Sequence, residues 1–192
     1  MVIVVGSPVL LGESIRPGRR AGGLAVGIAL AAAEAGARVE LVGKVGDDAA
    51  GDMIAVELER AGVGHAALLR DPSAATPSVA KDQALPLARQ DVELALRYLV
   101  DFRVIVAADP VSDPVAEAVA EAAHYGGAHL VVIGGEGAAV DGAVSNLRAP
   151  RGDEGPFATF VGRYAAHLDA GRDPGDAFTT AVSDVGWEPA RD

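Results

Sequence analysis

The feature that most constrains this chain is a regular alternation of short aliphatic runs with helical patterns. Runs rich in Val, Leu and Ile recur between longer segments whose apolar residues repeat every three to four positions. Such alternation is typical of βαβ units, in which crossover helices join parallel strands. The aliphatic runs lack a clean alternation of polar and apolar residues, as expected of strands that helices cover on both faces. We therefore expect an α/β fold with three layers, built on a mainly parallel sheet.

This pattern predicts the following elements. The expected strands are Val2–Val5, Arg38–Val42, Ala66–Leu69, Arg103–Ala107 and His129–Ile133. The expected helices are Gly23–Ala35, Ala50–Ala61, Asp91–Leu99, a helix that Ser112 caps and that runs through His124, Pro156–Ala170, and a last helix that opens at Asp173-Pro174. Pro, Arg and small residues are frequent in two further stretches, which we expect to be loops: Ser7–Arg20 and Asp71–Arg89.

Size and composition favour a single domain over residues 1–192 with a sizeable buried core. Half of the residues are hydrophobic but only 4% are aromatic, so small side chains allow helices to pack closely on the sheet. The chain has no cysteine, which excludes disulfides, thiolate metal sites and cysteine nucleophiles. The four histidines share no metal-ligand spacing, so we expect no metal site in the protein itself.

Charge and hydropathy limit the expected partners and location. A formal net charge of −11 gives no electrostatic footprint for nucleic acid or for an anionic membrane. The uncharged apolar run Gly22–Ala33 is shorter than the roughly 20 residues that a membrane-spanning helix needs. The first residues read as a strand and not as a signal peptide. We expect a cytoplasmic protein with no nucleic-acid or membrane partner.

The most specific motif is glycine-rich and runs from Gly22 to Gly51. It consists of Gly22-Gly23, a small-residue helix, a strand, and a turn that reads Gly-Lys-Val-Gly-Asp-Asp-Ala-Ala-Gly from Gly43 to Gly51. In physical terms, a glycine pair allows close backbone approach, and Asp47 or Asp48 caps the helix after the turn. On its residues alone, the turn is explained more simply by structure than by phosphate binding.

The same stretch resembles the first signature of the pfkB (ribokinase-like) carbohydrate and nucleoside kinases, and the match extends to about Val63. A second resemblance covers Thr159–Gly162, the helix that follows, and Ala170–Pro174, which look like the helix pair after the family's Asp-Thr-Thr-Gly-Ala-Gly-Asp signature. In that family this helix N-terminus forms an anion hole for the transferred phosphoryl group, and the last Asp is the base. The resemblance implies a ribokinase-like core, ATP with Mg²⁺ as the cofactor, and a sugar or nucleoside as the substrate.

Several residues depart from the family's catalytic pattern. When the chain is aligned on Thr159, the base position is Ala158, which cannot accept a proton. Pro156 removes an N–H donor from the anion hole, and Phe157 puts bulk where the family has glycine. Only the first glycine of that motif is kept, as Gly155.

The residues expected to contact the substrate also differ from the family's pattern. The stretch Ser7–Leu11 carries no carboxylate where the family has a polar Asn-x-Asp, and Gly27 offers no side chain to a sugar hydroxyl. The loops Ser7–Ala21 and Pro77–Arg89 are short for the β lid that covers the substrate in the family. We expect this lid to be reduced or absent, and the apolar surface so exposed to favour a homo-oligomer.

The candidate site residues fall into three groups. Candidate displaced bases are Asp153 and Glu154; candidate nucleotide contacts are Gly134, Gly135, Gly137 and Gly155; candidate substrate contacts are Gly22, Gly23 and Lys44. Plainer interpretations remain open, because acidic residues favour a helix N-terminus without any function, and a glycine cluster after a strand can be an ordinary turn.

Three functions are consistent with the sequence. The favoured one is a pfkB-type kinase that has lost phosphoryl transfer, leaving a nucleotide- or small-molecule-binding or interaction protein. The first alternative is an active ATP-dependent sugar or nucleoside kinase with an atypical site, in which Asp153 or Glu154 serves as the base. The second is a structural homo-oligomer without a ligand. Nucleotide binding separates the first two from the third.

Overall fold

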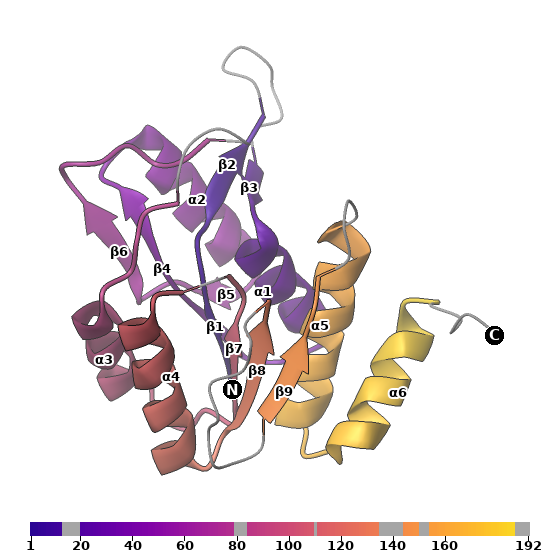
Figure 1. The fold of residues 1–192 in the computed structure, drawn as a ribbon. Coiled ribbons are helices and arrows are strands. Elements are labelled where there is room, and N and C mark those ends of the chain that lie inside the picture. The colour runs from indigo at the N-terminus through magenta and orange to yellow at the C-terminus, as the bar shows by residue number, and fades with distance from the viewer. Residues whose placement is uncertain (13–19, 79–83, 110, 135–143, 150–153, 187–192) are drawn as a thin grey trace.

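A parallel β-sheet lies at the centre of the computed structural model (Figure 1). The structure describes residues 1–12, 20–78, 84–109, 111–134, 144–149 and 154–186. Within these ranges, seven strands form the sheet in the order β5-β4-β1-β7-β8-β9, with β6 also paired to β4, and every pairing is parallel. The strands are β1 (Val2–Val5), β4 (Val39–Gly46), β5 (Val63–Gly64), β6 (Leu68–Asp71), β7 (Val104–Ala107), β8 (His129–Ile133) and β9 (Val144–Leu147).

Helices cover both faces of the sheet. One face carries α1 (Leu24–Glu34), α2 (Ala49–Arg60), α5 (Glu154–Asp169) and α6 (Pro174–Asp184), and the other carries α3 (Arg89–Tyr98) and α4 (Asp113–Gly126). Alternate residues of β1 divide between the two layers: Val2 and Val4 pack in the cluster with α1 and α5, whereas Ile3 and Val5 pack in the cluster with α3 and α4. The expected three-layer α/β arrangement is confirmed.

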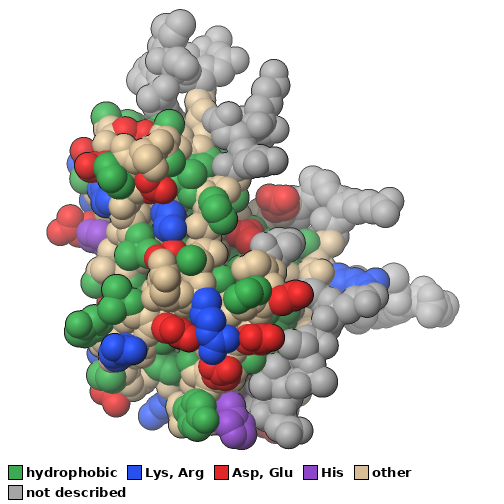
Figure 2. Space-filling view, turned by 60° about the vertical axis from the view of Figure 1, so that its left-hand side comes forward, with side chains coloured by type: hydrophobic (Ala, Val, Ile, Leu, Met, Phe, Trp, Pro, Cys, Tyr) green, Lys and Arg blue, Asp and Glu red, His purple; other side chains and the backbone are tan. Residues whose placement is uncertain are grey.

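The surface over α3 and α4 carries an ionic network. Arg89 on α3 bonds Glu93 on the same helix at 2.6 Å, and it reaches Glu117 and Glu121 on α4 at 3.2 and 2.6 Å. Figure 2 shows this side of the molecule, where acidic and basic side chains lie beside one another among hydrophobic ones. The network joins the two helices at their outer surface.

No helix in the described ranges is long and apolar enough to cross a membrane.

The structure corrects the prediction that Ser7–Arg20 is a loop. Val9–Leu11 forms β2 and pairs antiparallel with β3 (Arg20–Gly22), and this hairpin extends beyond the sheet (Figure 1). Each strand has only three residues, too few for a periodic signal, and burial of Leu10 and Ala21 stabilises the pairing. Within the described residues, this hairpin is the structure found in the stretch where the sequence analysis expects the lid to be reduced or absent.

Two further strands differ from the prediction. β9 is not expected from its sequence, Val-Ser-Asn-Leu, because two of its four residues are polar. The strand is held instead by Ser145, which forms hydrogen bonds of 2.8 Å with His129 on β8 and with Tyr164 on α5. The strand expected at Ala66–Leu69 lies two residues later, as β6, where it extends the sheet beside the second half of β4. The two-residue strand β5 is also not predicted, and the remaining elements agree with expectation to within a few residues.

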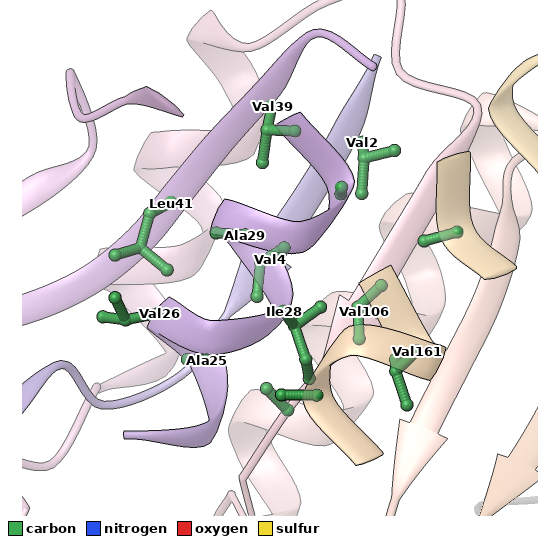
Figure 3. Packing of buried hydrophobic residues seen from close by; sticks show 14 of the residues in the cluster. Val2, Val4, Ala25, Val26, Ile28, Ala29, Val39, Leu41, Val106 and Val161 are labelled. Atoms are coloured by element: carbon green, nitrogen blue, oxygen red, sulfur yellow. The ribbon is translucent and has the colours of Figure 1, made fainter. Parts of the chain in front are cut away.

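The contact between α1 and α5 depends on very small residues. A Cβ atom on Gly162 of α5 would lie 2.6 Å from the Cβ of Ala31 and 2.6 Å from the carbonyl oxygen of Ile28, closer than real Cβ atoms come. Beside this contact, Ile28 belongs to the same buried cluster as Val106 of β7 and Val161 of α5 (Figure 3). The two helices therefore pack with their backbones nearly touching, and a larger residue at position 162 would separate them.

This packing gives a stability prediction. Gly162→Ala should destabilise the protein by about 1–3 kcal/mol, because the new methyl group meets backbone that cannot move aside. The matched control is Gly155→Ala on the same helix, where a Cβ meets nothing within 4 Å. There the substitution should be neutral or stabilise by up to about 1 kcal/mol, the usual helix preference for Ala over Gly. Urea unfolding measures both, and equal stabilities of the two variants would contradict the close approach.

Candidate functional site

Residues from distant parts of the sequence surround a hollow of about 590 Å³, which we call the hairpin hollow. Its walls are the hairpin β2–β3, the first half of α1, one residue of α2 and the start of α5. The sequence-predicted site residues that line it are Gly22, Gly23, Glu154 and Gly155. The volume lies in the range of about 300–1,000 Å³ that is usual for small-molecule sites.

The hollow adjoins the edge of the sheet where the parallel strands end. Just past β1, the backbone N–H of Ser7 donates to a carboxylate oxygen of Asp109, which follows β7, at 2.5 Å. A Cβ on Gly6 would lie 2.7 Å from the Cβ of Ala25, at the start of α1. The start of α1 therefore sits directly on the ends of these two strands. Ligands of open α/β folds bind outside this edge.

Ala158 and Gly27 are in direct contact at the wall of the hollow. Ala158 is only 5% exposed, and a Cβ on Gly27 would lie 2.9 Å from the Cβ of Ala158. The position where the resemblance expects a base thus holds a packed methyl group, and the position where it expects a polar substrate contact holds bare backbone. The sequence treats these as two separate departures, whereas the structure joins them in one helix–helix contact.

Two carboxylates lie near this contact. Glu154 is exposed, lines the hollow, and precedes Ala158 by one helical turn, so both project from the same side of α5. Asp109 is half-buried. Burial raises its pKa, the hydrogen bond from Ser7 opposes this, and the nearby Glu154 carboxylate raises the pKa further. Sequence analysis did not single out Asp109. Its place just after a buried strand of a parallel sheet is the signal that could have found it.

The remaining predicted site residues lie elsewhere or outside the described ranges. Lys44 on β4 does not line the hollow; its Nζ is 2.7 Å from a carboxylate oxygen of Asp91, which also accepts the N–H of Ala88 at the start of α3. Gly134 follows β8 with a φ of 78°, is exposed, and donates its N–H to Leu147. Three predicted residues fall outside the described ranges: Gly135, Gly137 and Asp153.

The turn between β4 and α2 is held by Asp48, in accord with its expected role as a cap. The Asp48 carboxylate accepts the N–H of Gly51 at 2.8 Å and both the N–H and the hydroxyl of Thr76, at 2.8 and 2.6 Å. The buried Thr76 hydroxyl in turn accepts the N–H of Gly46 at 2.9 Å. Burial favours the neutral acid, but the hydrogen bonds from Thr76 and Gly51 prevail and lower the pKa of Asp48. These hydrogen bonds account for the motif Gly43–Gly51 as a structural turn.

We predict that Thr76→Val destabilises the protein by about 1–3 kcal/mol at neutral pH, because it leaves buried partners of the hydroxyl unsatisfied. The folded-state pKa of Asp48 is depressed below 3.8, so the stability that its ionised form provides is present above that pH and lost as the pH falls through the folded value. The difference between wild type and Thr76→Val should therefore shrink below about pH 4.

The control for this experiment is Thr179→Val, at an exposed position where the hydroxyl donates only to a carbonyl of its own helix. Its effect should stay within about 0.5 kcal/mol at any pH. Chemical denaturation at several pH values measures both variants, and a Thr76→Val effect that does not vary with pH would contradict the role given to ionised Asp48.

Comparison with known proteins gives a partial family match and a fold. The family model described as "pfkB family carbohydrate kinase" matches residues 5–84. Among solved structures, the chain is similar to Sa239, with a TM-score of 0.72 and 15% identity over 99% of this chain and 95% of that one. A search of curated proteins finds no match.

Two ribokinase structures are also similar. One is a putative ribokinase II from E. coli in complex with ATP and Mg²⁺, with a TM-score of 0.66 and 13% identity over 100% of this chain and 93% of that one. The other is the Arabidopsis thaliana ribokinase complexed with ribose and ATP, with a TM-score of 0.66 and 14% identity over 96% and 90%. At such identities the likeness shows the fold, and it confirms the ribokinase-like core that the sequence predicts.

Proposed function

We propose, from the match of residues 5–84 to the pfkB family model and from the ribokinase-like fold, that this chain binds a small molecule in the hairpin hollow without phosphorylating it. One observation carries the proposal. The methyl group of Ala158, where the family has its base, is packed against the backbone of Gly27. A hydroxyl bound in the hollow would find no proton acceptor at that place.

The start of α5 supports the same conclusion. A helix N-terminus binds an anion through its free N–H groups and its positive dipole end. Here Pro156 has no N–H to offer, and the Glu154 carboxylate places negative charge at the helix end. Loss of one such donor costs on the order of 10²–10³ in rate in enzymes that depend on it. Together with the missing base, these changes oppose the transfer of an anionic phosphoryl group.

The cofactor that the family implies, ATP with Mg²⁺, finds only partial support in these residues. Gly155 lines the hollow and Gly134 ends a strand at the same edge of the sheet, so both remain proposed nucleotide contacts. The described ranges contain no group of three or more acidic or histidine side chains placed to hold a metal ion. We therefore derive no step through MgATP.

A second function remains a candidate because of Glu154. This carboxylate lies one turn before Ala158, lines the same hollow, and could take a proton from a hydroxyl bound there. In that case the protein would be an ATP-dependent sugar or nucleoside kinase whose base is displaced along α5. Glu154→Gln removes the proton acceptor while it keeps the size of the side chain, and so separates the two functions.

We predict that the wild-type protein, given MgATP and a panel of sugars and nucleosides, forms ADP no faster than in the absence of an acceptor, because no base is positioned. Glu154→Gln should give the same background rate. The matched control, Asp176→Asn, removes a first-turn carboxylate from α6, which does not line the hollow. Acceptor-dependent ADP formation that Glu154→Gln abolishes and Asp176→Asn retains would refute the proposal and establish the kinase alternative.

A further inference from the structure

The walls of the hairpin hollow are mainly hydrocarbon. Val9 and Leu11 face it from the hairpin, and Leu24 and Leu30 face it from α1. Sites that select sugars need polar side chains to pair with the hydroxyl groups, because a hydroxyl buried without a partner is costly. This hollow offers few such partners, so a polyhydroxylated ligand fits its walls poorly and an apolar one fits them well.

The apolar wall is fixed by packing. A Cβ on Gly22 would overlap the side chain of Leu11, so Leu11 lies flat across the backbone of the neighbouring strand. Leu10, on the opposite side of the same strand, is buried in the core with α1 and α2. The position of Leu10 therefore holds Leu11 on the side of the hollow.

The charged groups at the hollow favour a cation over an anion. Among the residues that the structure describes, two carboxylates line it, Glu57 from α2 and Glu154 from α5, and one guanidinium, that of Arg20. Glu57 is held in place because it accepts the N–H of Ala21 at 2.5 Å. Asp109 lies close enough to Glu154 for the two carboxylates to repel each other. A cation beside Glu154 would relieve this repulsion, and an anion would increase it.

We propose that the hairpin hollow binds a small apolar amine. The hydrocarbon part lies against Leu11 and the leucines of α1, and the ammonium group lies toward Glu154. This inference rests on the proposed binding function and assigns its ligand class, which differs from that of the sugar kinases the chain resembles. It requires the apolar wall and the Glu154 carboxylate to act together.

The test compares three probes that share a phenyl group and similar length: 2-phenylethylamine, 2-phenylethanol and 3-phenylpropionate. Calorimetry or ligand-observed NMR should rank their affinities as amine, then alcohol, then carboxylate. Glu154→Gln should weaken the amine roughly twofold to fivefold, as expected for one exposed charge pair, and leave the alcohol unchanged. Asp176→Asn, which removes an equivalent charge away from the hollow, should leave both unchanged.

A second variant tests the location without disturbing the fold. A side chain at position 155 would meet open space, so Gly155→Leu can extend into the hollow, and it also replaces a helical glycine. This variant should be at least as stable as the wild type and should lose both the amine and the alcohol. Full amine affinity in a stable Gly155→Leu variant would overturn the inference.

The outcomes also separate this inference from the proposed function. Tighter binding of 3-phenylpropionate than of 2-phenylethylamine would overturn the ligand class and leave the proposal of binding without phosphoryl transfer intact. No binding of any of the three probes would overturn the ligand class as well. Acceptor-dependent ADP formation would refute the proposed function, and it is read from a different assay.

Discussion

The close contact of α1 with α5 is the constraint on which the rest of this structure depends. Gly162 lets α5 approach the backbone of α1, and further along the same two helices Gly27 and Ala158 meet in the same way. Both helices also cover the sheet, through residues such as Ile28 and Val161 (Figure 3). The position of α5, and with it the start of that helix at the edge of the sheet, therefore follows from a row of residues with almost no side chain.

The same contact determines the chemistry of the hollow. A catalytic carboxylate on α5 and a polar substrate contact on α1 would need open space between the two helices, with a bound ligand in that space. Ala158 and Gly27 fill that space with each other, so packing takes the place of polar groups. The hairpin adds Leu11, and α5 adds Glu154 at its exposed end. The result is an apolar hollow with an acidic rim.

The sequence was sufficient for the layers and for most elements, because aliphatic periodicity reports directly which faces are buried. It also identified Ala158 and Gly27 as departures from the family, though not that they touch. Among the features that the sequence did not predict, three have a clear physical reason. β2 is too short for a periodic signal, β9 depends on hydrogen bonds of Ser145 to distant residues, and Asp109 gains its buried setting only from the ends of neighbouring strands.

The most direct test of this account is the free energy of unfolding of Gly27→Ala. The account predicts a loss of stability, because the new Cβ would lie 2.9 Å from that of Ala158, and recovery of most of the loss when Ala158→Gly is added to the same chain. An increase of about 1 kcal/mol, the usual result of Gly→Ala within an unobstructed helix, would contradict the contact. It would also remove the main reason to conclude that packing occupies the place of the catalytic base.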